Sequence, residues 1–130
     1  MLLRILLPSK VFLEAETVKV LAEAENGHFC LEPRHVDFVS ILVPGVLTYV
    51  ENGGRFWYVA LDEGILVKRG EEVRISTYKA IRGARLEILR EKVETEIRQL
   101  DEAERATRSA LARLEVGILR RYGRLSEVLK

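Results

Sequence analysis

Hydrophobic and polar residues alternate with a period of two in much of the first 83 residues, most clearly over 18–25 and 73–78. This period places every second side chain on the same face of a strand. Strand-like segments occupy residues 18–25, 29–31, 38–43, 46–50, 56–60, 65–67 and 73–77. Turn-forming dipeptides separate several of them, namely Asn26-Gly27, Pro44-Gly45 and Asn52-Gly53. Short strands at this spacing, without helical stretches between them, predict an antiparallel β-sandwich or barrel.

After Gly83 the hydrophobic pattern takes the period of a helix. Residues 84–116 contain no Gly or Pro and are rich in Ala, Glu, Arg and Leu, which are good helix formers. Apolar residues spaced by three and four form two stripes: Leu86, Leu89, Val93, Ile97 and Leu100, then Leu111, Leu114, Ile118, Tyr122 and Leu125. Between the stripes, Asp101 and Glu104 resemble a capping box. We predict two antiparallel helices, over 84–100 and 102–123; one continuous helix is the alternative, because no helix breaker separates them.

The change of period divides the chain into a β-sandwich domain over residues 1–83 and a helical hairpin domain over 84–130. The expected fold class is therefore α+β. Hydrophobic residues make up 48% of the chain, too many for a disordered tail. A single cysteine excludes an internal disulfide framework and favours a reducing compartment. The apolar start is interrupted by Arg4 and Pro8, and no segment approaches the ~18 apolar residues of a membrane span, so we expect no membrane insertion.

The charge of the chain is balanced overall but divided unequally between the predicted helices. A net charge of +1 argues against a general nucleic-acid binder, which needs a clear surplus of cations. The segment 84–102 contains four cationic and six anionic residues, whereas the segment 103–130 contains seven cationic and three anionic residues. Opposite charges favour packing of one helix on the other, and the surplus arginines could meet an acidic partner. A solvated basic face is the simpler interpretation of charge alone, because exposed ion pairs each contribute less than ~1 kcal/mol.

No catalytic constellation is visible in the sequence. It contains neither a Walker-type phosphate loop nor a nucleophile elbow, so we expect no catalytic residues. His28, Cys30 and His35 lie close together, but their spacing matches no zinc pattern and a fourth ligand is not evident. We therefore expect no metal site, and we interpret Cys30 as a small core or strand residue.

Five segments, in this order, resemble the epsilon subunit of bacterial F-type ATP synthase: residues 25–35, 43–47, 58–67, 80–83 and 112–116. They are similar to the family's Glu-Gly to Pro-Gly-His segment, its Lys-Pro-Gly turn, its strand pair around Gly-Gly, its domain junction and part of its last helix. The resemblance covers nearly the whole chain. Arg34 and Val36-Asp37 depart from the family's residues on either side of His35, and the helices are shorter. Residues 35–39 and the early first strand resemble the alternate N-type branch, whose rotary ATPases can pump sodium.

This resemblance implies a non-catalytic central-stalk subunit at the cytoplasmic face of the bacterial inner membrane. Such a subunit bridges the gamma subunit and the c-ring and couples ATP synthesis or hydrolysis to proton or sodium transport. The resemblance also implies that the loops with His28 and His35 lie near the polar loops of the c-ring. It also implies that the helical hairpin either folds onto the sandwich or extends toward the catalytic beta subunits. In the extended state, an acidic segment of the beta subunits would meet the last helix, and the first candidates for this contact are Arg105, Arg108 and Arg113. This extended state would restrain ATP hydrolysis.

ATP binding is the alternative function that the resemblance suggests. Many bacterial members bind ATP through a Leu/Ile-Asp-x-x-Arg-Ala motif, which matches residues 86–91 here. Arg90 is retained and could meet a phosphate. Glu87 replaces the family's Asp, and Glu91 replaces its Ala, which adds negative charge where a polyanion would approach. Glu87 and Arg90 are therefore candidates for a regulatory ATP site, while ordinary exposed helix residues are the other interpretation; we expect no resident cofactor.

Overall fold

A computed structural model describes residues 1–25, 27–97 and 102–128, with the side chains of 102–105 and 121–128 left out. Its strands are β1 (Leu2–Leu7), β2 (Lys10–Ala24), β3 (Gly27–Leu31), β4 (Phe38–Leu42), β5 (Gly45–Glu51), β6 (Phe56–Leu61), β7 (Gly64–Arg69), β8 (Glu72–Thr77) and β9 (Ala80–Gly83). A helix α1 (Leu86–Lys92) continues into a π-helical turn η1 (Val93–Ile97), and α2 (Glu102–Val128) follows. The α+β fold class, with strands first and helices last, is confirmed.

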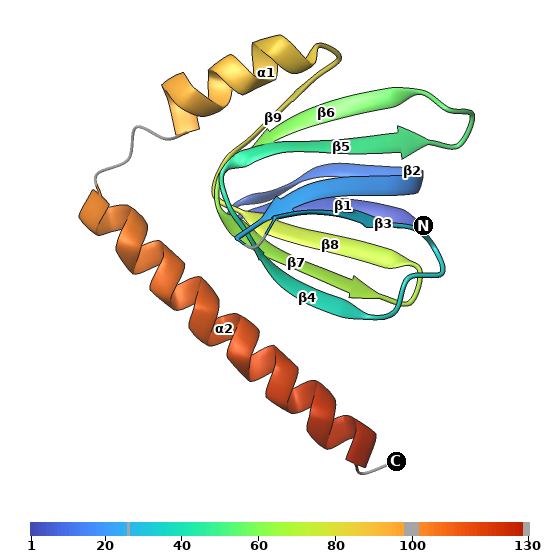
Figure 1. Cartoon of the computed structure of the whole chain (residues 1–130), viewed down its shortest axis with the longest axis vertical. Coiled ribbons are helices and arrows are strands. Elements are labelled where there is room, and N and C mark those ends of the chain that lie inside the picture. Colours follow the sequence, from blue (N-terminus) through green and yellow to red (C-terminus); the bar gives the residue numbers. More distant parts are fainter. Residues whose placement is uncertain (26, 98–101, 129–130) are drawn as a thin grey trace.

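The strands pair in the order β1-β8-β7-β4-β2-β5-β6-β9, and β3 adds to β2. The long β2 also pairs with β1, so the sheet closes back on itself around one core (Figure 1). All the other described pairs are antiparallel, but β1 and β8 run parallel, with Leu3 opposite Val73. The sequence did not predict this pair, because turn dipeptides report only hairpins between consecutive strands. The expected strand at 18–25 also proved to be only the second half of β2.

The sandwich core lies between the strand layers and contains alternate residues of several strands. Its members are Met1, Leu3, Ile5, Val20, Ala22, Leu31, Leu42, Leu47, Tyr49, Val59, Leu61, Leu66, Val73 and Ile75. Burial of a side chain of this size stabilises the fold by about 1.5–3 kcal/mol. The core therefore accounts for the packing of the strands into one sandwich.

A second, smaller cluster attaches α1 and η1 to the outer face of β6. Leu89, Val93 and Ile97, which belong to the first predicted helical stripe, pack on Ala60. Gly83 permits this close approach, because a Cβ at that position would lie 3.3 Å from Leu89 Cδ2. Strand β6 is thus covered on both faces, by the core on one side and by α1 and η1 on the other.

The two helices lie on different parts of the sandwich. Figure 1 shows α1 above β6 and β9, whereas α2 crosses diagonally beside β4 and β7. The expected packing of one helix on the other is therefore not the arrangement observed in the described residues. The apolar stripe of α1 faces the sheet, and arginines of α2 reach carboxylates of the sandwich. Neither described helix is long and apolar enough to cross a membrane.

Candidate functional site

The contact between α2 and the sandwich, here called the α2 seam, centres on the turn formed by Asp62 and Glu63 between β6 and β7. Arg108 Nη1 donates a hydrogen bond of 3.0 Å to Asp62 Oδ2, and the two side chains are only 16% and 4% exposed. The guanidinium of Arg108 also lies over the Tyr78 ring, with its Cζ 3.8 Å from the ring centroid. Ser109 Oγ donates to Glu63 Oε2 at 2.6 Å. The seam therefore centres on a largely buried ion pair.

The neighbouring strand β8 holds this turn in place. Thr77 Oγ1 donates to the carbonyl oxygens of Asp62 and Glu63 at 3.1 and 3.0 Å. Asp62 Oδ1 accepts a hydrogen bond of 2.7 Å from the Glu63 backbone N–H. Gly64 is required after the turn, because a Cβ there would lie 2.3 Å from the Ser76 carbonyl oxygen. The backbone of the turn and the Asp62 carboxylate are therefore held by contacts that do not involve α2.

Beyond the seam, α2 makes weaker polar contacts with the sandwich. Arg113 pairs with the carboxylate of Glu25, and both side chains are more than one-third exposed. Arg120 donates to the Val39 carbonyl oxygen at 3.0 Å. An exposed pair of this kind contributes less than ~1 kcal/mol. Arg108 is therefore the main polar anchor of α2 among its described side chains.

The three arginines named from the sequence thus differ in their surroundings. Arg108 and Arg113 contact carboxylates of the chain itself, so neither is free for a partner in this arrangement. The side chain of Arg105 lies outside the described residues. Their assignment to a beta-subunit contact stays a prediction.

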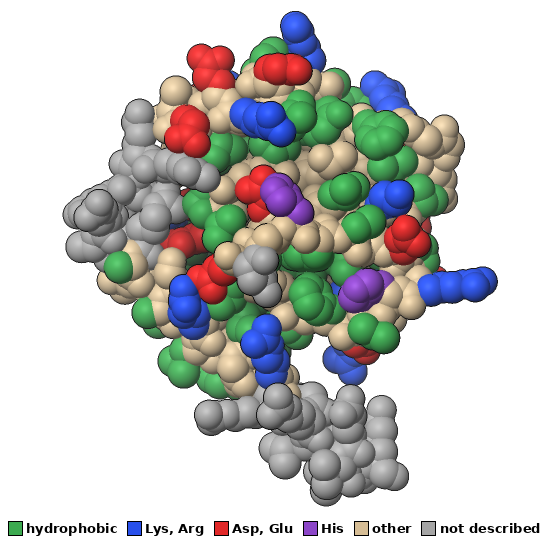
Figure 2. Space-filling model, in the orientation of Figure 1, with side chains coloured by type: hydrophobic (Ala, Val, Ile, Leu, Met, Phe, Trp, Pro, Cys, Tyr) green, Lys and Arg blue, Asp and Glu red, His purple; other side chains and the backbone are tan. Residues whose placement is uncertain are grey.

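Both histidines named from the sequence lie on one face of the molecule (Figure 2). His28 is on β3 with its side chain 80% exposed, and its Nδ1 lies 3.8 Å from Glu23 Oε1. His35 lies in the loop between β3 and β4, where its ring meets Phe38 edge-on at a centroid distance of 5.8 Å. Their proximity to a rotor ring stays a prediction.

A buried lysine that the sequence analysis missed holds the loop of His35. Lys68 on β7 is 1% exposed, and its Nζ donates to the His35 carbonyl oxygen at 2.9 Å and to the Gly70 carbonyl oxygen. The Gly70 N–H in turn donates to Asp37 Oδ1 at 2.9 Å. Lys68 therefore joins the β3–β4 loop to the β7–β8 turn. The available signal was a lysine two residues after Leu66, and so on the same face of the strand.

The structure separates the two candidates for ATP binding. Arg90 lines a cavity of about 380 Å³ between α1 and strands β2 and β5, together with His28, Glu23 and Glu94, whereas Glu87 does not line it. Two carboxylates in the wall disfavour a polyanion beside a single arginine. An ATP site on Glu87 and Arg90 stays a prediction.

The three residues considered as metal ligands remain apart. Cys30 is an exposed residue of β3, which agrees with a strand position but not with a core position. Within the ranges that the structure describes, no three His, Cys, Asp or Glu side chains gather as a metal site would require.

Comparison with known proteins identifies the family. The model of the ATP synthase delta/epsilon chain β-sandwich domain matches residues 1–83. The ATP synthase epsilon chain 2 of Paraburkholderia xenovorans is 36% identical over 104 residues, covering 76% of this chain and 73% of that one. The epsilon chain of Herpetosiphon aurantiacus is 30% identical over 132 residues, covering 92% and 95%.

Solved structures of mitochondrial ATP synthases share the fold. A chain of the Euglena gracilis enzyme, solved with OSCP, F1 and c-ring, has a TM-score of 0.59 at 20% identity. The match covers 89% of this chain and 72% of the Euglena chain. A chain of the Tetrahymena thermophila central stalk and c-ring has a TM-score of 0.53 at 17% identity. That match covers 88% of this chain and 92% of the Tetrahymena chain. The family model and the relatives agree with the resemblance seen in the sequence, and the chain belongs to the delta/epsilon chain family of ATP synthase.

Proposed function

We propose that this chain is a non-catalytic rotor-stalk subunit that bridges the gamma subunit and the c-ring of a rotary ATPase. The match of its whole sandwich to the ATP synthase family model carries the proposal. The similar Tetrahymena chain comes from an assembly of central stalk and c-ring, which supports the same place for this one. A close-packed sandwich suits the transmission of torque, because such interiors deform little. The subunit would sit peripherally at the cytoplasmic face of the bacterial inner membrane and couple ATP turnover to proton or sodium movement.

The loop containing His35 and the strand containing His28 would face the c-ring. Both side chains are on one face, and Lys68 fixes the loop from beneath. A fixed loop can pass a sideways force into β7, whereas a loose loop would absorb it.

The α2 helix would act as a brake on ATP hydrolysis when it leaves the sandwich. In the docked state Asp62 and Glu25 hold Arg108 and Arg113. An acidic segment of a beta subunit would compete for the same guanidinium groups, together with Arg105. Because docked and extended forms present different charges, partner binding shifts the population between them.

Truncation and reconstitution test this function. A chain ending at Ile97 keeps the α1 cluster and lacks α2, whereas a chain ending at Gly83 lacks both. We expect the first variant to stay folded and to co-purify with gamma, and the assembled complex to hydrolyse ATP faster. Failure of the complete chain to bind gamma would contradict the stalk assignment. Unchanged hydrolysis with normal assembly would contradict only the brake. A folded, assembling 1–83 fragment would support the division into domains 1–83 and 84–130.

A regulatory ATP site is the second candidate, because Arg90 lines the cavity beside α1. Calorimetric titration of the chain with ATP tests it, with Arg90→Gln as the variant and Arg85→Gln, at the exposed N-cap of α1, as a control. A heat of ATP binding that is lost in Arg90→Gln but kept in Arg85→Gln would support the site. Absence of heat at millimolar ATP would exclude it.

A further inference from the structure

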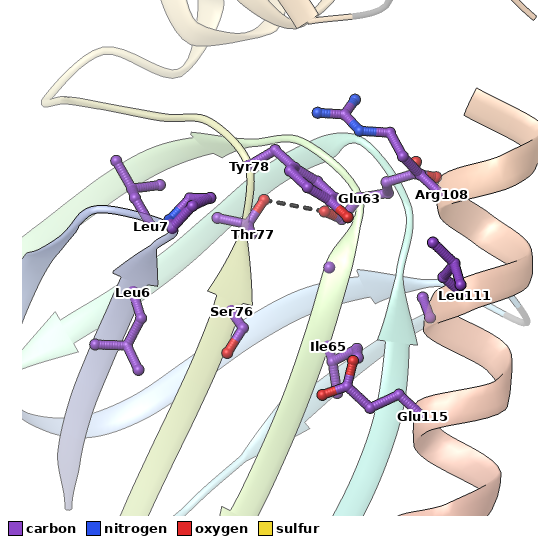
Figure 3. Close-up of a pocket in the computed structure, with 13 residues that line it drawn as sticks. Leu6, Leu7, Glu63, Ile65, Ser76, Thr77, Tyr78, Arg108, Leu111 and Glu115 are labelled. Atoms are coloured by element: carbon purple, nitrogen blue, oxygen red, sulfur yellow. Dashed lines mark hydrogen bonds between the residues drawn. The ribbon is translucent and has the colours of Figure 1, made fainter. Parts of the chain in front are cut away.

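Helix α2 turns its apolar stripe away from the sandwich. Leu114 and Ile118 are 63% and 58% exposed, whereas Val116 between them is buried. Each lies two residues from Val116, which is about 160° around the helix, so both are on the side opposite the sheet. Leu111 is at the edge of the same stripe, where it also borders the cavity between α2 and the sandwich (Figure 3). We call Leu111, Leu114 and Ile118 the outer stripe.

The polar side of α2 is basic. Its described side chains, those of residues 106–120, include three arginines and one acidic residue, Glu115. Arg108 and Arg113 reach carboxylates of the sandwich, and Figure 3 shows Arg108 extending from α2 toward Tyr78. In both pairs the guanidinium belongs to α2 and the carboxylate to the layer behind it. Arg120 bonds only to a carbonyl oxygen among the described residues, so its charge is not compensated there. The α2 side of the molecule is therefore positive toward anything that approaches the outer stripe.

The border of the outer stripe distinguishes between two kinds of partner. A partner helix is usually selected by charged residues on both sides of an apolar seam. One side of the outer stripe has Ala110 and Gly117 instead, and a Cβ at Gly117 would meet nothing within 4 Å. A helix with an apolar face, an arginine-rich polar face and a polar overall composition is the type that lies in the interface of a lipid bilayer. The observations therefore favour a lipid surface over a partner helix.

We propose that the outer stripe of α2 binds the surface of an anionic lipid bilayer. Leu114 and Ile118 enter the boundary between headgroups and acyl chains, which such helices reach to a depth of about 5–10 Å. The arginines of α2 lie within a Debye length of about 10 Å from the surface, so negative headgroups attract them. The helix lies on the bilayer and does not cross it, in agreement with its length and polarity. This lipid contact goes beyond the proposed stalk function and does not depend on it, because the isolated chain can be tested.

Flotation with vesicles tests the proposal. The complete chain would be mixed at low salt with vesicles of equal parts phosphatidylcholine and phosphatidylglycerol, and separately with vesicles of phosphatidylcholine alone. We expect binding to the mixed vesicles that decreases with added salt, and binding about tenfold or more weaker to the neutral ones. Equal binding to the two kinds of vesicle would overturn the proposal. Binding to neither would overturn it too, and would assign the outer stripe to a protein partner.

Substitutions in the outer stripe show whether it makes the contact. A double variant, Leu114→Gln with Ile118→Gln, should keep the fold because both positions are exposed, and should bind the mixed vesicles about tenfold or more weakly. Ile88→Gln is the matched control, at a 45% exposed apolar position of α1, and should bind like the unaltered chain. Full binding by the double variant would refute the site.

Paramagnetic lipid headgroups locate the contact independently. In mixed vesicles that contain them, the methyl NMR signals of Leu111, Leu114 and Ile118 should broaden more than those of Ile88 and Leu21, which are exposed elsewhere. Broadening centred on the sandwich would refute the proposal. A chain ending at Ile97 should lose vesicle binding and still bind gamma. A complete chain that binds vesicles but not gamma would contradict the stalk function alone.

Discussion

The sandwich and the α2 helix are attached to this molecule by different kinds of contact. Strands distant in sequence pair throughout the sandwich, and its core side chains are almost completely buried. In α2, Val116 is the one buried hydrophobic side chain among those that the structure describes, whereas Leu111, Leu114 and Ile118 of its predicted apolar stripe are exposed. The contacts that hold α2 are chiefly polar, with Arg108 at their centre.

This difference indicates two levels of stability in one chain. Burial of many apolar side chains makes the sandwich a cooperative unit, whose opening requires most of the unfolding free energy. Release of α2 breaks few contacts and exposes little new apolar surface. We therefore expect α2 to leave the sandwich without unfolding it, as a brake that engages and disengages would require.

The largest effect should come from a cavity in the sandwich core. Leu66→Ala removes a fully buried side chain of β7 and should lower the free energy of unfolding by about 2–5 kcal/mol. Leu114→Ala, at a 63% exposed position of α2, should change it by less than about 0.5 kcal/mol. Urea denaturation followed by tryptophan fluorescence compares the two variants. Similar losses would contradict the two levels of stability.

Removal of the buried lysine should have the next largest effect. Lys68→Met keeps the length of the side chain but leaves the carbonyl oxygens of His35 and Gly70 without their donor. We expect a loss of about 1–3 kcal/mol in unfolding free energy, and faster amide exchange over residues 32–37. The exposed Lys10→Met serves as the control. Unchanged exchange in that loop would show that Lys68 does not hold it.

The α2 seam should respond locally. Arg108→Gln removes the ion pair between α2 and the buried Asp62 carboxylate, so amide exchange in α2 should accelerate by about tenfold or more, while the sandwich amides keep their protection. Arg113→Gln, whose ion pair is exposed, should change exchange by less than about fivefold, the equivalent of ~1 kcal/mol. Equal effects of the two substitutions would mean that Arg108 is not the main anchor.

The smallest effect concerns an exposed pair at the end of the first helical segment. Lys92 Nζ donates to Glu96 Oε1 at 2.9 Å, and this hydrogen bond lowers the pKa of the Glu96 carboxyl below its ordinary value. A carboxyl with a depressed folded-state pKa contributes stability above its unfolded-state pKa and loses it as the pH falls through the folded value. Lys92→Met should return the pKa of Glu96 upward, as an NMR titration would show, with almost no change in thermal stability. An unchanged pKa would contradict the pairing.

Several features could be read from local sequence because they depend on neighbouring residues. The period of two marked most strands, and the stripe of Leu89, Val93 and Ile97 correctly indicated a helix with one buried face. Strand β9 was missed and its residues were interpreted only as a junction, because four residues carry too little periodicity to identify a strand. The second helical stripe was also predicted to lie on one helical face, but its members Leu111, Leu114 and Ile118 are exposed. Polar partners on the sandwich determine which side of α2 faces inward.

The sequence by itself determined the order of strands and helices, the change of period at residue 83 and the family, since these depend on local spacing and on segments in a fixed order. Only the tertiary structure decided that β1 lies parallel to β8, that Lys68 supports the loop of His35, and that Asp62 and Glu63 receive α2. Each of these contacts joins residues far apart along the chain. Their pairing follows from how buried polar groups find partners once the core has formed, and local patterns do not encode it.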